Sequence, residues 1–318
     1  MSGLQTTNTV FAVRPCRFQS NPQTASSNAF QAIQPWSDAE ASNRLAQQQF
    51  DELVRQLDRH GVRCIVIEDA PEPHTPDSVF PNNWISTHAD GTVVLYPMEA
   101  VNRRLERRQD IVVALTKQHG FDVARQIDLS TFEASAQFLE GTGSLVFDRD
   151  HKVAFACLSS RTHGAPLDAF DAQLGFRSVR FDSLDSAGQR IYHTNVMMSI
   201  GREFAVICNE SIPDDQRARV LAELEALEKR IVPISYAQLG AFCGNMLALH
   251  NHQGDQVLAM SQQACDALTR AERGLLEGYA DLAVADIAHI ETQSGGGVRC
   301  MLAEVHLPPR QSVVNAVD

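Results

Sequence analysis

The sequence predicts a mixed α/β fold built from repeated units, and three observations support this prediction. Short apolar runs typical of strands alternate with longer amphipathic stretches typical of helices. Three segments that begin at residues 141, 193 and 244 share one order of strand, turn and strand. No linker rich in Pro, Gly or Ser divides the 318 residues, so we expect a single domain over residues 1–318.

The expected elements follow one another along the whole chain. At the start of the third expected helix, Pro213 precedes Asp214 and Asp215, and proline and acidic residues suit a first helical turn. Helices are expected at residues 41–60, 99–119, 213–230 and 269–279. Strands are expected at residues 10–15, 63–69, 92–97, 144–148, 152–158, 204–209, 246–251 and 256–261.

The repeated unit places polar residues at matching positions. Ser144, Asn195 and Asn245 are 51 and 50 residues apart, as expected of supersecondary units that cannot bury their apolar faces alone. Weaker copies begin near residues 82–87 and near Cys300. If such units are arranged about an axis, the starts of their first strands meet at one centre. The residues at those starts are Asn82, Asn83, Glu140, His193, Asn245 and Cys300.

Composition and charge exclude several classes of protein. The net charge of −12 argues against nucleic-acid binding, which needs clustered Lys and Arg. No apolar run approaches the ~20 residues of a membrane span, and the first 15 residues lack the features of a signal peptide. Seven cysteines without a CxxC spacing favour reduced thiols over disulfides or a zinc site. We therefore expect a cytoplasmic protein that binds neither nucleic acid nor membrane.

Cys300 is the strongest candidate for a nucleophile. It closely follows three glycines, residues 295–297, which let a backbone approach a substrate and close flexibly around it. A thiol attacks as its thiolate, and a nearby histidine lowers the pKa to supply that form. His193 and Glu140 stand at matching repeat positions, and a carboxylate that orients a histidine keeps it charged and able to donate a proton. The alternative is a buried structural cysteine beside a glycine turn.

Six motifs resemble those of the guanidino-group-modifying (pentein) superfamily of arginine deiminases, dimethylarginine hydrolases and amidinotransferases. They are PDSVFPNNW (76–84), RRLE (103–106), FLEGTGSLVF (138–147), SSRTHGA (159–165), YHTNVMM (192–198) and GGGVRCM (295–301). The resemblance covers essentially the whole chain. It implies a five-bladed α/β propeller with pseudo-fivefold ββαβ repeats, which agrees with the repeat described above.

The resemblance also implies roles for individual residues. Cys300 corresponds to the nucleophile, His193 to the general acid and base, and Glu140 to the partner of that histidine. The basic run 102–108 is typical of a solvated helix face, but the resemblance instead places Arg103 at the substrate carboxylate. The implied substrate-binding residues are Arg103 and Arg161 for the carboxylate, Asp77 for the amino acid end, and Phe80, Asn82, Asn83 and Asn195.

Two asparagines depart from relatives that act on a cationic guanidinium. Asn83 stands where an aspartate closes the matching segment, and Asn195 stands where arginine deiminases carry a second aspartate. A guanidinium favours carboxylates, since each charge-assisted hydrogen bond contributes ~1.5–3 kcal/mol. A neutral ureido group offers a carbonyl acceptor and N–H donors, which an amide can match. The departures favour citrulline over arginine, as in a bacterial subgroup of citrulline hydrolases.

Further departures concern carboxylate binding and the N-terminus. Gly295 stands where arginine deiminases place an arginine, so the substrate carboxylate must be bound elsewhere. Gly141-Thr142-Gly143 stands where the family commonly has Gly-Gly-Asp, so the closing aspartate is missing. The segment 13–31 is similar to one in the citrulline hydrolases, and it either contacts substrate or caps the first blade. It contains Arg14, Asn21 and Asn28.

The residues and the resemblance together predict an L-citrulline hydrolase that forms ornithine, carbon dioxide and ammonia through a covalent intermediate on Cys300. Backbone N–H groups beside Cys300 are expected to stabilise the oxyanion. No metal or organic cofactor is required, the partner is a small amino acid, and self-association is left open. The alternatives are an arginine deiminase, dimethylarginine hydrolase or amidinotransferase, and, in another class, a pentein that binds an amino acid without catalysis.

Overall fold

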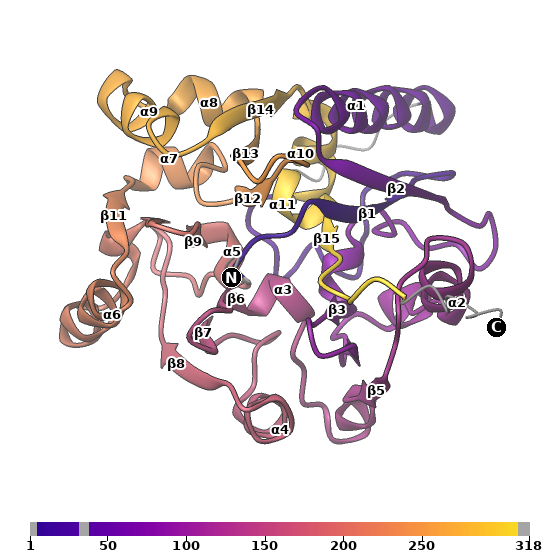
Figure 1. The fold of residues 1–318 in the computed structure, drawn as a ribbon, viewed down its shortest axis with the longest axis horizontal. Coiled ribbons are helices and arrows are strands. Elements are labelled where there is room, and N and C mark those ends of the chain that lie inside the picture. Colours follow the sequence, from indigo (N-terminus) through magenta and orange to yellow (C-terminus); the bar gives the residue numbers. More distant parts are fainter. Residues whose placement is uncertain (1–4, 32–37, 311–318) are drawn as a thin grey trace, which may run out of the picture.

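The computed structural model describes residues 5–31 and 38–310, in which the strands form five three-stranded sheets (Figure 1). In each sheet the first strand pairs antiparallel with the second, and the second pairs parallel with the third. The sheets are β3 (Ile85–Thr87), β4 (Thr92–Leu95) and β5 (Arg125–Asp128); β6 (Val146–Asp148), β7 (Val153–Cys157) and β8 (Arg177–Phe181); β9 (Met198–Ile200), β10 (Phe204–Ile207) and β11 (Arg230–Pro233); β12 (Leu247–His250), β13 (Gln256–Ser261) and β14 (Asp281–Ala285); and β15 (Ala303–Glu304), β1 (Thr9–Arg14) and β2 (Arg63–Glu68).

Helices connect the second strand of each sheet to the third, because parallel neighbours need a crossover connection. These helices are α1 (Ala39–Arg59), α2 (Gln109–Lys117), α4 (Gly164–Leu174), α6 (Asp214–Ala226), and the pair α8 (Gln262–Ala267) and α9 (Arg270–Glu277). Along α1, Ala46, Phe50, Leu53 and Leu57 are buried at helical spacing, and the helix packs on β1, β2 and β14.

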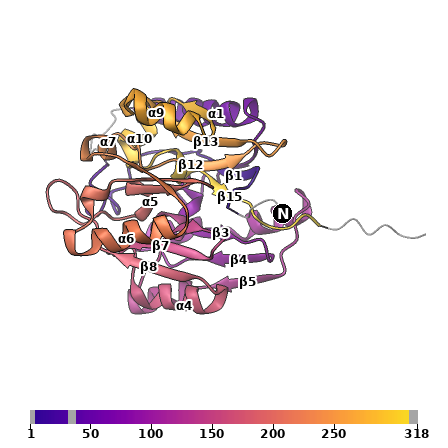
Figure 2. The same ribbon diagram turned by 60° about the vertical axis from the view of Figure 1, so that its left-hand side comes forward.

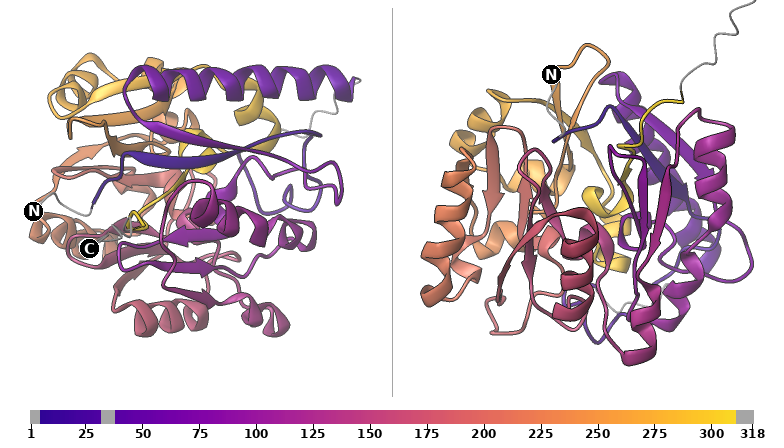
Figure 3. Two further views of the ribbon diagram at one scale, coloured as in Figure 1. Left: turned by 45° about the vertical axis from the view of Figure 1, so that its right-hand side comes forward. Right: turned by 60° about the horizontal axis from the view of Figure 1, so that its bottom comes forward.

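The two ends of the described chain meet in one sheet. β15 pairs antiparallel with β1, with Val10 opposite Glu304. First strands of neighbouring sheets lie side by side, with β15 near β3, β6 near β9, and β9 near β12. Figures 2 and 3 show the connecting helices, such as α1, α4, α6 and α9, on the outside of the molecule and the strands towards its middle. The arrangement confirms the predicted five-bladed propeller of ββαβ units.

A short helical turn precedes the first strand in four of the five blades among the described residues. Because Ser144 lies in such a turn, the strand expected at 144–148 begins at Val146 instead. The turns are η1 (Pro81–Asn83), α3 (Gly141–Ser144), α5 (Thr194–Met197) and α11 (Val298–Met301). The remaining short helices are η2 (Val101–Glu106), η3 (Ser130–Ser135), η4 (Asn209–Ser211), α7 (Tyr236–Gly240) and α10 (Ala288–Ser294).

The prediction of one helix over residues 99–119 is wrong. The segment contains η2 and α2, separated by extended backbone at Arg107 and Arg108. The guanidinium of Arg107 donates to the carboxylate of Glu133, at 3.0 Å from Nη2, and to the backbone oxygen of Tyr96. These contacts with other segments keep the backbone of Arg107 extended, so that η2 and α2 do not join into one helix. The basic run is therefore not a solvated helix face, and Arg103 within it is buried.

A substitution at Gly141 tests how tightly two blades pack at the starts of their first strands. Its φ is +47°, and a Cβ there would overlap the backbone oxygens of Asn82 and Asn83. We expect Gly141→Ala to lower the free energy of unfolding by about 3 kcal/mol or more, from left-handed strain plus overpacking. Gly188 is the matched control, because its φ is +77° and a Cβ there would have no neighbouring atom within 4 Å. Gly188→Ala should cost only about 1 kcal/mol. Equal losses in urea unfolding would contradict the packing explanation.

Candidate active site

Cys300 lies in α11, and its side chain is surrounded by amides. The residue is 4% exposed. Its Sγ accepts hydrogen bonds from Nδ2 of Asn195 at 3.4 Å and from Nδ2 of Asn245 at 3.3 Å. Asn245 also donates to the backbone oxygen of Asn195 and accepts from the backbone N–H of Arg299. Residues at the starts of three first strands therefore meet at the sulfur atom.

The protonation state of Cys300 differs from the expectation. Burial raises the pKa of the thiol above its ordinary value of 9.0, while the Asn245 and Asn195 amides and the charge of Arg299 oppose this rise. Among the described residues, the hydrogen-bond partners of Sγ are these two amides and not His193. The thiol of Cys300 is therefore neutral at pH 7, and an attack by this sulfur would first require its deprotonation.

The glycines before Cys300 accommodate protein side chains. Gly295 has a φ of +67°, and a Cβ there would lie 2.6 Å from Oδ1 of Asn28. A Cβ on Gly296 would lie 2.6 Å from the ring of Phe80, and one on Gly297 would lie 2.7 Å from Oδ1 of Asn245. These distances are too short for a methyl group. The three glycines thus allow an N-terminal residue, the Phe80 ring and the Asn245 amide to approach the nucleophile segment.

His193 and Glu140 form a buried pair, and His193 lines the same cavity as Cys300. Nε2 of His193 lies 2.8 Å from Oε2 of Glu140, and both side chains are at most 2% exposed. The other carboxylate oxygen accepts from the backbone N–H of Glu99. Burial alone would raise the pKa of Glu140, but the charge of Arg161 and the His193 hydrogen bond hold it well below its usual range.

The ionised Glu140 fixes the tautomer of His193. Because a carboxylate only accepts, Nε2 carries the proton and Nδ1 is left as the basic atom. Burial lowers the pKa of His193 to about 4, although Glu140 opposes this shift. The imidazole is therefore neutral in the empty site, which corrects the expectation that the carboxylate keeps it charged. A neutral Nδ1 is ready to accept a proton from a thiol or from water.

Two arginines sit beside this pair, and both already have protein partners. Arg103 makes a bidentate contact with Glu106, at 3.0 and 2.9 Å. Arg161 lies 3.4 Å from Glu140 and donates to the hydroxyl of Ser27 and the backbone oxygen of Thr24. Both guanidinium groups are buried and border the cavity beside Cys300.

That cavity brings most of the predicted residues together. Of its lining side chains, Asp77 is the one acid within the described part of the chain. Asn195 borders the sulfur, but Asn82 is fully buried and is not among the lining residues. The cavity is lined by Thr24, Asn28, Asp77, Phe80, Asn83, Arg103, Arg161, Tyr192, His193, Ser294, Gly296 and Cys300.

Several buried polar atoms around the sulfur and the cavity lack a protein partner in the described structure. They are Oδ1 of Asp77, Nδ2 of Asn83, Oδ1 of Asn195 and Oγ of Ser294. Such atoms are costly to bury unpaired, and they are the groups a ligand can satisfy. For Asn83 the assignment is unambiguous. Arg103 donates to its Oδ1 at 2.8 Å, and a guanidinium cannot accept, so the free atom is the N–H₂ donor.

The N-terminal segment closes one side of the cavity. Asn21 donates to Asp77 at 2.7 Å, and Asn28 donates to the backbone oxygen of Ser294 at 2.8 Å. Arg14 instead pairs with Asp51, at 2.8 Å. Within the segment 13–31, Asn21 and Asn28 thus belong to the site, whereas Arg14 binds a helix.

The expected oxyanion donors are already occupied. The N–H of Arg299 donates to Oδ1 of Asn245, and the N–H of Cys300 donates to the backbone oxygen of Gly297. The free Nδ2 of Asn83 is the better candidate. The sequence predicts Asn245 only as a repeat position; its direct contact with the sulfur cannot be predicted, because no local pattern indicates where its amide points.

The described residues contain no group of three or more His, Cys, Asp or Glu side chains placed to hold a metal ion. In the same part of the chain, no helix combines the length and apolar character that crossing a bilayer requires.

The pH dependence of alkylation tests the neutral thiol. Because burial raises the pKa of Cys300 above 9.0, its rate of reaction with iodoacetamide should keep rising above that pH. Asn245→Ala removes a donor that stabilises the thiolate, so it should slow alkylation at pH 8 about tenfold. Asn251→Ala, at the far end of the same blade, is the control. Peptide mass spectrometry gives the rate for each cysteine. A plateau below pH 8 would contradict this description, and so would an unchanged rate in Asn245→Ala.

Comparison with known proteins places the chain in a family. Residues 14–307 match the family model described as N,N dimethylarginine dimethylhydrolase, eukaryotic. No curated protein sequence matches the chain. Solved structures share the fold at low identity. One is the substrate-bound N-terminal domain of ArgZ, an arginine dihydrolase from Cyanobacteria. It is 16% identical to this chain and has a TM-score of 0.71, and the match covers 95% of this chain and 99% of that one.

Two further structures show the same fold. A ternary complex of AgrE with ornithine and NAD+ has 16% identity and a TM-score of 0.71, over 96% of this chain and 40% of that one. A dimethylarginine dimethylaminohydrolase adduct with S-methyl-L-thiocitrulline has 15% identity and a TM-score of 0.62, over 94% and 99% of the two chains. The family match over most of the chain and the shared five-bladed fold lead to one conclusion. The chain belongs to the N,N-dimethylarginine dimethylhydrolase family, within the guanidino-modifying pentein superfamily.

Proposed function

We propose that the protein is a cysteine-dependent hydrolase of the ureido group of L-citrulline, forming ornithine, carbon dioxide and ammonia. One observation carries the choice of substrate: Arg103 occupies Oδ1 of Asn83, so Asn83 presents an N–H₂ donor. A ureido group has a carbonyl oxygen to accept it, whereas a guanidinium has donors only. On the other side, the free Oδ1 of Asn195 accepts a ureido N–H.

The charges around the cavity support a neutral reacting group. Two arginines and one aspartate line it among the described residues, and Glu140 is already paired with His193 and Arg161. A guanidinium bound there would meet no free carboxylate next to the sulfur, and burying an unpaired cation costs several kcal/mol. The zwitterionic end of an amino acid fits better. Its ammonium suits the unpartnered Oδ1 of Asp77, and its carboxylate suits the arginines.

The first half of the reaction follows from the protonation states. As Sγ of Cys300 attacks the ureido carbon, Nδ1 of His193 accepts the thiol proton, and Glu140 stabilises the imidazolium that results. The amides of Asn195 and Asn245 stabilise the developing thiolate. The carbonyl oxygen becomes an oxyanion beside Nδ2 of Asn83. His193 then protonates the departing nitrogen, leaving an S-carbamoyl group on the cysteine.

Hydrolysis completes the cycle with the same residues. Neutral His193 takes a proton from water, whose oxygen attacks the thiocarbamate carbon, and the thiolate leaves and is reprotonated. The product carbamic acid loses carbon dioxide and releases the nitrogen that stayed on the carbamoyl carbon, so that ornithine and ammonia are both formed. This sequence consumes one water and needs no redox step.

Substrate preference is tested with citrulline, arginine, methylated arginines and agmatine, measuring ornithine and ammonia together. We expect citrulline to give both products faster than any guanidino compound. Asn83→Asp should lower kcat/KM for citrulline about a hundredfold or more, because it removes the oxyanion donor, and should tighten arginine binding. Asn251→Asp, remote from the cavity, controls for added charge. Faster ammonia release from arginine than from citrulline in the unmodified protein would refute citrulline as the substrate.

The nucleophile is tested separately. Cys300→Ala should abolish turnover while citrulline still binds, because the cavity keeps its polar groups. Electrospray mass spectrometry of the unmodified protein, quenched during turnover, should show a carbamoyl-type adduct on Cys300. Citrulline binding without turnover in the unmodified protein would instead favour a non-catalytic amino-acid-binding pentein.

The cytoplasmic location and the absence of a cofactor remain predictions.

A further inference from the structure

A second convergence of side chains lies at the end of the axis opposite Cys300. The first strand of each blade begins near the active site, so the residues at its other end come together on the far face. Each blade contributes one basic residue at or just after that end. They are His88, Arg149, Arg202, His250 and His306.

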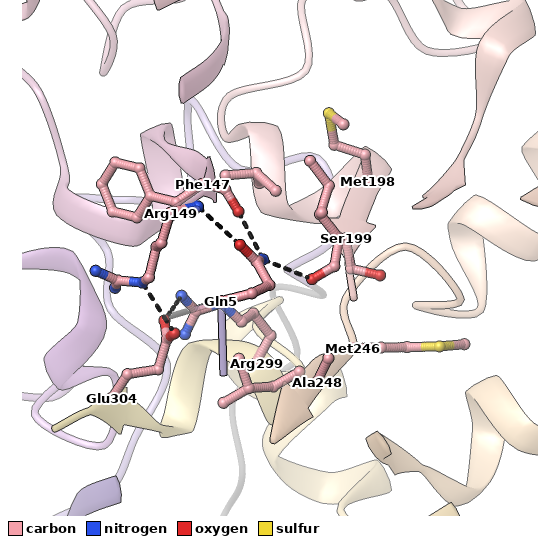
Figure 4. A pocket seen from close by; sticks show the side chains of 12 residues that line it. Gln5, Phe147, Arg149, Met198, Ser199, Met246, Ala248, Arg299 and Glu304 are labelled. Atoms are coloured by element: carbon pink, nitrogen blue, oxygen red, sulfur yellow. Dashed lines mark hydrogen bonds and ion pairs between the residues drawn. The ribbon is translucent and has the colours of Figure 1, made fainter. Parts of the chain in front are cut away.

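The N-terminal segment occupies the axis itself on this face. Nε2 of Gln5 donates to the backbone oxygens of Phe147 and Ile200, and its Oε1 accepts from the backbone N–H of Arg149 (Figure 4). Thr6 contacts Arg202 at 3.1 Å and His250 at 2.9 Å. The side chains of Arg202 and His250 are therefore engaged by the N-terminal segment, whereas those of His88 and His306 line one cavity together with Arg149.

Arg149 carries a buried positive charge that its partners do not balance. Glu304 lies 2.6 Å from Arg299 and only 3.5 Å from Nε of Arg149, so one carboxylate serves two guanidinium groups (Figure 4). His306 contacts the same carboxylate at 3.0 Å, and burial, followed by the charge of Arg149, lowers the pKa of His306 to about 4. It is therefore neutral, and the group holds one surplus positive charge.

One nitrogen of Arg149 also lacks a partner. Its Nη1 donates to the backbone oxygen of Thr87 at 3.3 Å, but Nη2 has no hydrogen-bond partner in the described structure, and the residue is only 7% exposed. Figure 4 shows the outer nitrogens of Arg149 turned away from Gln5 and the axis. A buried guanidinium nitrogen without an acceptor is unfavourable unless a ligand supplies one.

A half-open cavity of about 550 Å³ adjoins this guanidinium. Besides Arg149, the cationic side chain of Lys152 lines this cavity. The acidic side chain of Asp90 also lines it, but its carboxylate already pairs with Arg125 and accepts from the backbone N–H of Thr92. Phe176 belongs to its apolar wall. The lining residues are His88, Ala89, Asp90, Arg149, Lys152, Leu174, Phe176 and His306.

We propose that this cavity binds a small organic anion, with its carboxylate or phosphate group on Arg149 and Lys152 and its apolar part against Phe176. A guanidinium matches the two oxygens of such a group, and an ammonium adds a second charge-assisted contact. The site is separate from the cavity at Cys300 and does not depend on the identity of the substrate. Arg299, the neighbour of Cys300 in sequence, connects the two ends through Glu304.

Isothermal titration calorimetry with benzoate, phenyl phosphate and inorganic phosphate tests the site on the full chain. We expect saturable binding of benzoate or phenyl phosphate, tighter than that of inorganic phosphate because of the apolar wall. Comparing benzoate with phenyl phosphate identifies the preferred head group. Arg149→Met and Lys152→Ala should each weaken binding about tenfold. Lys117→Ala, an exposed lysine on α2, should leave it unchanged.

The variants are chosen so that misfolding does not obscure the result. Arg149→Met leaves Glu304 paired with Arg299 and His306, and circular dichroism checks its fold. If that variant does not fold, the exposed Lys152 decides the outcome alone. The proposal is overturned if no probe binds saturably up to about 10 mM. It is also overturned if ornithine displaces the probe, which would place binding at Cys300, or if Lys152→Ala binds as tightly as the unmodified protein.

Discussion

The rest of the site depends on the contacts made by the buried carboxylate of Glu140. It accepts hydrogen bonds from the His193 ring and from the backbone N–H of Glu99, and it forms an ion pair with Arg161. Arg161 in turn holds the N-terminal segment through Ser27 and Thr24. Because an unpaired charge at this depth would cost several kcal/mol, these groups are fixed together, and the wall of the cavity is fixed with them.

A second constraint is the supply of hydrogen-bond donors to sulfur and oxygen. The Cys300 thiol and the His193 imidazole are both neutral, and the charges of Glu140, Arg103 and Arg161 are paired with one another or with protein groups. Amides then take the place of charges: Asn195 and Asn245 face the sulfur, and Asn83 faces the expected oxyanion. Neutral donors of this kind suit a neutral ureido group and offer little to a guanidinium, which links the electrostatics of the cavity to the proposed substrate.

The propeller explains why both ends of the axis are chemically distinctive. Each first strand carries polar residues where it begins and a basic residue where it ends. At the beginning, these groups meet around Cys300. At the end, Arg202 and His250 contact the N-terminal segment, while His88, Arg149 and His306 line the adjoining cavity. The strands between them are short, and Arg299 and Glu304 belong to the same segment as the nucleophile. Glu304 therefore connects Arg149 to the segment that holds Cys300.

The sequence alone determined the repeat and the residues at the starts of the first strands, because hydrophobic periodicity and a constant spacing are local properties of the chain. The five-bladed class came from the resemblance of its motifs to the pentein superfamily. Cys300, His193 and Glu140 were found in this way. Only the tertiary structure decided which atoms are free. The Asn83 amide is oriented by Arg103, the backbone N–H groups near Cys300 are occupied by Asn245 and Gly297, and burial sets the protonation of the thiol. These outcomes depend on neighbours distant in sequence and on desolvation, and no local pattern of residues encodes either of them.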